Sequence, residues 1–134
     1  MRTRSAGDRY FNPLVKSIPD RQAAYLLDIL RCVEAIHSYV AGQTHEQFLH
    51  DGKTQDAVLR RLLVAGEAAA RLTPETCSEL PNIPFYKIVG MRNRVVHDYT
   101  NVDLEIVWET VHAHLPLLHK ELQAFFAERA DPSV

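Results

Sequence analysis

The chain has 134 residues, 46% of them hydrophobic and 24% charged, with a formal net charge of −2 and a pI near 6.4. This length suits one domain with a single core, and no apolar run approaches the roughly 18 residues of a membrane span. The near-neutral charge excludes a broad nonspecific nucleic-acid surface, which needs many phosphate contacts. A small basic site stays possible, and its candidates are Lys87, Arg92, Arg94, Arg60, Arg61 and Arg71.

Residues 1–19 show no sustained periodicity and contain Pro13 and Pro19, which predicts an irregular N-terminal arm. The arm has no apolar segment of the kind found in signal peptides, so we expect a cytoplasmic protein without a membrane span. Cys32 and Cys77 match neither a Cys-x-x-Cys redox pair nor a zinc-ligand spacing. We interpret them as small, partly buried thiols.

The first predicted helix extends from Asp20, its expected N-cap, to Gly42. Its apolar residues recur at helical spacing and are Leu26, Ile29, Leu30, Val33, Ile36 and Val40. The segment THEQFLHDGK then predicts one short helical turn, capped by Thr44 and stopped by Asp51 and Gly52.

A second long helix is predicted over residues 53–72, with two adjacent apolar stripes. One stripe contains Val58, Leu62, Ala65, Ala69 and Leu72, and the other contains Leu59, Leu63, Gly66 and Ala70. The small residues in this wide face would let another helix approach closely. The following residues, 73–84, contain three prolines and are interpreted as a connector.

A third helix is predicted to start near Pro84 and to continue through the motif MRNRVVHDY, residues 91–99. The apolar residues of its stripe are Phe85, Ile88, Val89 and Val96. One position of the same stripe is occupied by Arg92. Because a buried unpaired charge costs several kcal/mol, Arg92 must find an anion, another chain or a water-filled cleft.

A fourth helix is predicted after TNVD, with Asp103 as its cap and a kink at Pro116. Apolar residues line one side of it and are Leu104, Trp108, Val111, Leu115, Leu118, Leu122 and Phe125. No segment shows strand alternation. We therefore predict an all-α fold, an up-and-down antiparallel bundle of four main helices plus a short one over residues 20–130, followed by a tail at 131–134.

The polar residues of the motif are spaced so that some share one helix face. Asn93 lies four residues before His97 and on its face, whereas Arg92 lies about 140° around the helix from His97. We expect the helix to end near Asp98, which would place His97 and Tyr99 at its C-terminal end. Histidine transfers protons near neutral pH and arginine pairs with phosphate oxygens, so the pattern fits phosphodiester chemistry without a metal.

The spacing alone leaves a structural interpretation open for the same residues. Arg92 would then bridge to Asp98 or Glu67, and His97 would be a half-buried residue at a helix end. Glu67, which lies among small residues, is either a supporting partner of Arg92 or a solvated helix residue.

The remaining histidines and aromatic residues give weaker signals. We interpret five histidines as surface residues rather than metal ligands, because their spacings do not build a ligand set. They are His45, His50, His112, His114 and His119. Trp108 and Tyr39 fit core or dimer-interface positions better than a base-stacking platform, although stacking stays open.

Arg92, Asn93, His97 and Tyr99 resemble the Arg-x4-His-x-Tyr signature of the HEPN superfamily, specifically the HepT-like toxins of prokaryotic toxin–antitoxin pairs. The resemblance extends over roughly residues 21–122. Its segments occur in the order and spacing of the family and are YLLDILRCVEAIHSYVAG, LRRLLVAGEAAARL, FYKIVGMRNRVVHDYTNVDLEIVWETV and LPLL. The long N-terminal arm departs from the family's usual short start, but this departure does not touch the motif.

The resemblance implies a homodimer in which the motifs of two subunits form a composite cleft. It also implies a metal-independent endoribonuclease without a cofactor, with tRNA among its candidate substrates. His97 would be the acid/base group, Arg92 would stabilise charge on the phosphate, and Asn93 would orient the phosphate or the imidazole. The implied partner is a nucleotidyltransferase antitoxin, MntA, which would silence the toxin of a type VII-like pair by transferring AMP to Tyr99.

Two other functions are compatible with the sequence. One is a noncatalytic HEPN helical module that binds nucleotide or substrate for a partner nucleotidyltransferase, and the other is a purely structural helical dimer. Growth arrest by the chain alone, relieved by Arg92→Ala, would favour the toxin over both.

Overall fold

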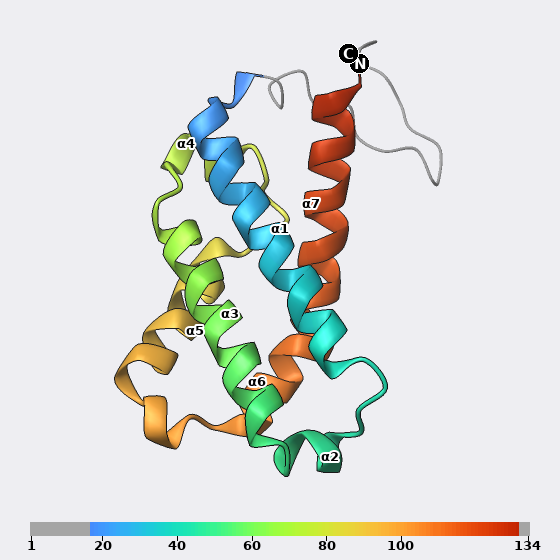
Figure 1. Cartoon of the computed structure of the whole chain (residues 1–134). Helices are drawn as coiled ribbons and strands as arrows, with labels where there is room; N and C mark the ends of the chain where they lie inside the picture. The colour runs from blue at the N-terminus through green and yellow to red at the C-terminus, as the bar shows by residue number, and fades with distance from the viewer. Residues whose placement is uncertain (1–16, 132–134) are drawn as a thin grey trace.

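A computed structural model describes residues 17–131, and every regular element in that range is helical (Figure 1). The long helices are α1 (Asp20–Val40), α3 (Gly52–Ala70), α5 (Phe85–His97) and α7 (Leu115–Ala130). The short elements are α2 (His45–Leu49), α4 (Pro74–Ser78), the 3-10 helix η2 (Tyr99–Asn101), α6 (Leu104–Glu109) and the π-helix η3 (Thr110–His114). The predicted all-α fold class is confirmed. The predicted N-terminal arm and C-terminal tail lie almost entirely outside the described residues.

The four long helices form a row in the order α5, α3, α1, α7. Helix α3 packs on both α1 and α5, and α7 packs on the other side of α1. Figure 1 shows that neighbouring helices of the row run in opposite directions. No helix among residues 17–131 is both long and apolar enough to cross a membrane.

The core lies along the centre of this row and is built from the predicted apolar stripes. Its fully buried side chains include Leu26, Ile29 and Ile36 of α1, Val58 of α3 and Leu122 of α7. Fully burying one such side chain stabilises the folded chain by about 1.5–3 kcal/mol, so these stripes fix which helix faces meet. Helix α5 lies at one edge of the molecule, with Val95 of its motif in the core and His97 exposed.

Two predicted helix caps are confirmed. The Oγ1 atom of Thr44 accepts a hydrogen bond from the Gln47 amide at 3.1 Å and begins α2. The Oδ1 atom of Asp103 accepts one from the Glu105 amide at 2.9 Å and begins α6. Each cap satisfies an amide that has no partner within its helix.

Two other boundary predictions are wrong. Pro19, and not Asp20, is the N-cap of α1, and the Asp20 carboxylate instead accepts a hydrogen bond from Arg129 at 2.7 Å. Asp51, expected to stop the short helix, caps α3 by accepting from the Thr54 amide at 3.1 Å. Asp20 is thus the first residue of α1 and pairs with Arg129, whereas Asp51 is the N-cap of α3.

The fourth predicted helix is divided into α6, η3 and α7, with the irregularity directly before the expected kink at Pro116. Proline has no amide hydrogen, and its ring crowds the carbonyl four residues earlier. The wider π-turn of η3 avoids that contact and lets the chain continue as α7.

Candidate active site

The motif occupies the last two turns of α5 and the turn that follows. Phe85 and Val95 bury one side of α5, and the helix ends where the Asp98 amide donates to the carbonyl of Arg94 at 2.9 Å. Tyr99 then begins η2. The predicted helix end near Asp98 is therefore confirmed, and the motif lies on a helix end that is anchored by one buried face.

Arg92 is held by two side chains. Its Nε donates to Oε1 of Glu67 on α3 at 2.8 Å, and its Nη1 donates to Oδ1 of Asn93 at 2.6 Å. The side chains of Arg92 and Glu67 are 27% and 43% exposed, so the pair lies at the border of core and solvent. The hydrogen bond from Arg92 lowers the pKa of the Glu67 carboxyl, which keeps it charged at neutral pH. Of the two partners that the sequence left open for Arg92, the structure has Glu67.

Gly66 allows this arrangement because α3 and α5 approach each other closely there. A Cβ atom on Gly66 would lie 2.0 Å from the Cβ of Arg92 and 3.2 Å from the carbonyl oxygen of Ile88. No side chain larger than hydrogen fits without moving one of the helices. Gly66 was not among the sequence-based site residues, although its small-residue stripe had predicted a close helix contact.

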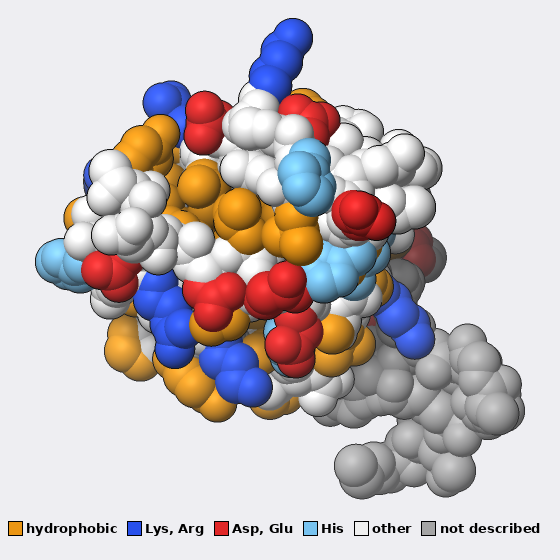
Figure 2. Space-filling view, turned by 90° about the horizontal axis from the view of Figure 1, so that it is seen from below, with side chains coloured by type: hydrophobic (Ala, Val, Ile, Leu, Met, Phe, Trp, Pro, Cys, Tyr) orange, Lys and Arg blue, Asp and Glu red, His pale blue; other side chains and the backbone are white. Residues whose placement is uncertain are grey.

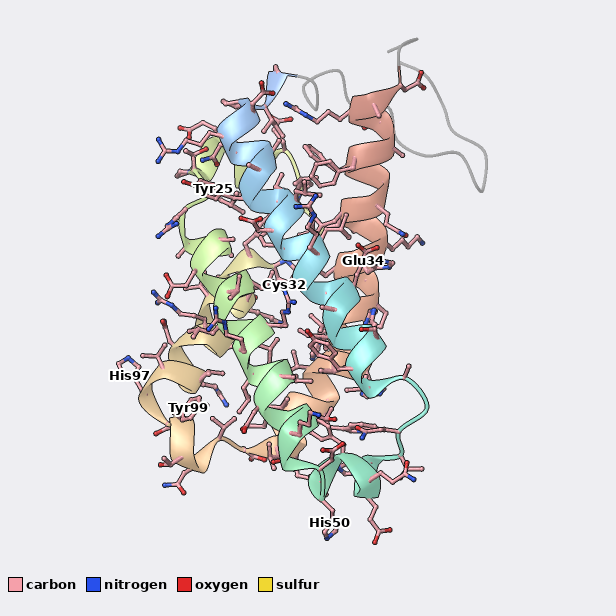
Figure 3. The ribbon with its side chains drawn as sticks, viewed as in Figure 1. Tyr25, Cys32, Glu34, His50, His97 and Tyr99 are labelled. Atoms are coloured by element: carbon pink, nitrogen blue, oxygen red, sulfur yellow. The ribbon has the colours of Figure 1, made fainter. Side chains whose placement is uncertain are left out.

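His97 and Tyr99 are exposed and lie apart from the Arg92 pair. Figure 3 shows His97 projecting from the outer edge of the molecule, away from the other helices. Tyr99 is 60% exposed on η2. Neither side chain has a hydrogen bond or an ion pair with a residue in the range 17–131. A single chain thus brings Glu67, Arg92 and Asn93 together and leaves His97 free on the face that it shares with Asn93.

The remaining basic candidates lie on two helices. Those on α3 or at its C-terminal end are Arg60, Arg61 and Arg71, and those on α5 are Lys87 and Arg94. Arg61 on α3 donates from Nε to the Tyr39 hydroxyl at 3.2 Å and is not part of the motif surface. Lys87 and Arg94 are exposed residues of α5. Figure 2, a view of the lower end of the molecule, shows a row of carboxylates across that end, with basic side chains on more than one side of it.

The histidines outside the motif have structural contacts. The ring centroid of Trp108 lies 5.3 Å from that of His45 and 3.8 Å from that of His112. His119 Nε2 lies 3.2 Å from a Glu34 carboxylate oxygen. Within residues 17–131, no three His, Cys, Asp or Glu side chains are grouped so that they could hold a metal ion. Trp108 packs against the hydrophobic core, as the sequence had predicted.

The sequence profile of one family, described as Ribonuclease HepT-like, matches residues 29–125, which include all of α5 and the motif. The chain belongs to this HepT-like family. The resemblance deduced from the motif is therefore confirmed. No solved structure matches the chain.

Relatives of this HepT-like chain occur in archaea and bacteria. A protein of Methanocaldococcus jannaschii, named "Putative RNase MJ1216", is 34% identical over 100 residues, which cover 75% of this chain and 83% of the relative. A Thermococcus cleftensis protein, named "Probable ribonuclease HepT", is 36% identical over 94 residues, which cover 70% and 86%. "Putative RNase TTE0752" of Caldanaerobacter subterraneus is 33% identical over 99 residues, which cover 74% and 88%.

Proposed function

We propose that this HepT-like chain is a metal-independent endoribonuclease and the toxin of a toxin–antitoxin pair. The observation that carries the proposal is the complete Arg-x4-His-x-Tyr motif, which extends from α5 into η2 and lies inside the region matched by the family. The held guanidinium of Arg92 and the free imidazole of His97 supply the two chemical functions that RNA cleavage requires.

The proposed reaction uses the internal nucleophile of RNA. The ribose 2′-oxygen attacks the adjacent phosphorus and loses its proton to a base, while the bond to the 5′-oxygen breaks and that oxygen gains a proton. The products are a 2′,3′-cyclic phosphate and a free 5′-hydroxyl. His97 serves these proton transfers, Arg92 stabilises the added charge on the phosphate, and Asn93 helps to orient the guanidinium to which it is bonded.

A homodimer fits this chemistry better than a single chain. Because Arg92 and His97 point about 140° apart on one helix, one α5 does not enclose a phosphodiester. A second subunit facing this surface would bring another Arg92 and His97 to the same cleft. In support, Val96 is 51% exposed beside His97, which leaves an apolar contact available.

Tyr99 is the proposed site of control by a nucleotidyltransferase antitoxin. Its hydroxyl would attack the α-phosphorus of ATP, release pyrophosphate and lose its proton, which leaves AMP on the tyrosine. A bulky, negatively charged group two residues from His97 would exclude the RNA phosphate from the cleft. The test is the mass of the Tyr99 peptide after incubation with the antitoxin and ATP. Neutralised toxin with an unmodified peptide would contradict this mode of control.

Incubation of the purified chain with tRNA or total RNA in EDTA tests the nuclease proposal. We expect cleavage by the native chain and its loss in His97→Ala, with His50→Ala as the control because His50 is an exposed histidine outside the motif. Equal cleavage by the His97→Ala variant would mean that the observed nuclease is a contaminant.

Growth measurements separate the toxin from a noncatalytic HEPN module. Expression of the chain alone should stop growth, and Arg92→Ala should relieve the arrest. A chain that leaves growth unchanged and cleaves no RNA, yet binds nucleotide for a partner enzyme, would favour the noncatalytic function.

A further inference from the structure

An open groove lies between α5 on one side and α6, η3 and α7 on the other. It has a volume of about 540 Å³, and apolar side chains of α1 and α3, including Ile36 and Leu62, form its floor. This volume is within the roughly 300–1,000 Å³ range of ligand sites. We call it the α5–α7 groove. Its α5 wall runs along the helix that carries the motif.

Both charged side chains that line the groove are basic. Lys87 and Arg94 line the α5 wall, His114 lines the opposite wall, and no Asp or Glu contributes to the lining. The whole chain has 17 acidic residues and 15 basic ones, so a lining without carboxylates departs from the rest of the molecule. Neither Lys87 nor Arg94 has an ion pair with a residue between 17 and 131. Two unpaired cations beside an apolar floor favour a ligand that is both anionic and rich in flat apolar surface.

The cations are spaced for a chain of phosphates. Lys87 and Arg94 are seven residues apart on one flank of α5, which separates them by about 10 Å along the helix axis. Tyr86, which is 74% exposed, also lines the groove and offers an aromatic face to a base. Arg94 lies one helical turn before His97, so the groove leads directly to the motif.

The groove has an acidic boundary at one end. A smaller cavity of about 190 Å³ shares Met91, Arg94 and Ile106 with it and is also lined by Asp98 and Asp103. Their carboxylates would repel a phosphate from the smaller cavity. A bound strand would therefore be confined to the segment between Tyr86 and the motif.

We propose that the α5–α7 groove binds a segment of single-stranded RNA next to the cleavage site. The phosphates contact Lys87 and Arg94, and the bases lie against Tyr86 and the apolar floor. To cover the groove, a second copy of the chain would have to place carboxylates against both cations. The inference rests on the proposed ribonuclease function, since it extends the substrate path from His97.

Binding of an uncleavable oligonucleotide tests the groove separately from catalysis. The probe is a single-stranded oligoribonucleotide with methylated 2′-hydroxyls, and its affinity for the full chain is measured over a series of salt concentrations. In the double variant Lys87→Ala/Arg94→Ala, we expect affinity to fall roughly tenfold or more and the salt slope to fall by about 1.4, since each single-strand phosphate contact contributes about 0.7. The charge-preserving variant Lys87→Arg/Arg94→Lys should retain most of the binding.

The matched control removes two positive charges elsewhere. Lys53→Ala/Lys120→Ala changes two exposed lysines outside the groove and should leave the salt slope unchanged. His97→Ala should bind the probe like the native chain while losing cleavage. Thermal unfolding of every variant verifies that it is folded.

The outcomes separate the groove from the nuclease. A groove variant that binds the probe with native affinity and slope would overturn the groove proposal, and so would a native chain that does not bind it. A groove variant with native affinity but an altered mass in light scattering would assign the groove to contact between subunits. If the native chain binds the probe through Lys87 and Arg94 but cleaves no unmodified RNA, the nuclease proposal is contradicted and the groove proposal stands.

Discussion

At the scale of single residues, the site depends on a connected chain of contacts rather than on the motif alone. Gly66 gives Arg92 room, Glu67 binds its Nε, and Asn93 accepts from its Nη1. The guanidinium is therefore oriented before any substrate arrives, and preorganised charge is what stabilises an anionic transition state.

Gly66→Ala should disrupt this arrangement more than any other Gly→Ala change on α3. The added methyl would overlap Arg92, so we expect a loss of about 1–3 kcal/mol in the free energy of unfolding, as for other overpacked sites, together with lower RNA cleavage. Urea denaturation measures the stability. Gly52→Ala is the control because nothing lies within 4 Å of its added Cβ. Equal stability of the two variants would show that α3 and α5 adapt freely.

Glu67→Gln tests whether the charge of Glu67 matters for Arg92. The folded-state pKa of Glu67 is lowered by Arg92, so their interaction is present above the ordinary carboxyl range and is lost as pH falls through the folded pKa. We expect roughly tenfold slower cleavage at neutral pH. In the native chain, protonation of Glu67 at acid pH should lower the cleavage rate. This fall in rate should be absent from the pH profile of the Glu67→Gln variant. A native pH profile in the variant would remove Glu67 from the account.

At the scale of elements, the long helices with a clear apolar period were predictable from sequence, whereas a one-turn helix without such a period was not. The stripes of the first, second and fourth predicted helices and the caps at Thr44 and Asp103 followed from sequence, because these signals are local. The stripe predicted for α5 was wrong at its end, where Val95 is buried and Val96 is 51% exposed. The short helix α4 lay in the segment interpreted as a connector, since one turn carries no detectable period. Asp51 caps α3 through a local contact with the Thr54 amide and hydroxyl, a signal that the prediction of a stop at Asp51 overlooked.

The site shows the same division between local and long-range signals. The motif on α5 and its helix end followed from sequence, but the choice between Asp98 and Glu67 as the partner of Arg92 did not. Glu67 is 25 residues away, and only the packing of α3 on α5 brings it within 2.8 Å of Arg92.

Asp103→Ala should weaken the start of α6 and the turn that joins it to the motif. Its carboxylate accepts from the amides of Glu105 and Ile106, and the loss of such a cap costs about 1 kcal/mol, within a range of 0.5–2 kcal/mol. Asp103→Asn is the matched control, since an asparagine oxygen accepts the same bonds. Equal urea midpoints for the two variants would contradict the prediction that the side-chain oxygen at position 103 stabilises the start of α6.

At the scale of the whole molecule, the proposed cleavage mechanism requires a second subunit. Helix α5 lies at one edge of the row of helices (Figure 1). The side chains of Asn93, Val96 and His97 on this helix are exposed. A monomer would leave the proposed catalytic side chains exposed to water. The proposed dimer encloses them.

Val96→Asp should separate the subunits. A carboxylate in an apolar contact loses its hydration without gaining a partner, so we expect the mass in light scattering to fall to that of one chain and RNA cleavage to be lost. Ser38→Asp, on the exposed side of α1, should change neither. A Val96→Asp protein that keeps the mass of the native protein would place the interface of the proposed dimer on another face.

The chemical ends of RNA cut in EDTA report how the phosphodiester bond was broken and so test the proposed mechanism. We expect 2′,3′-cyclic phosphate and 5′-hydroxyl ends from the native chain and no such fragments from His97→Ala. Fragments with 3′-hydroxyl and 5′-phosphate ends, or cyclic ends produced equally by the variant, would contradict it.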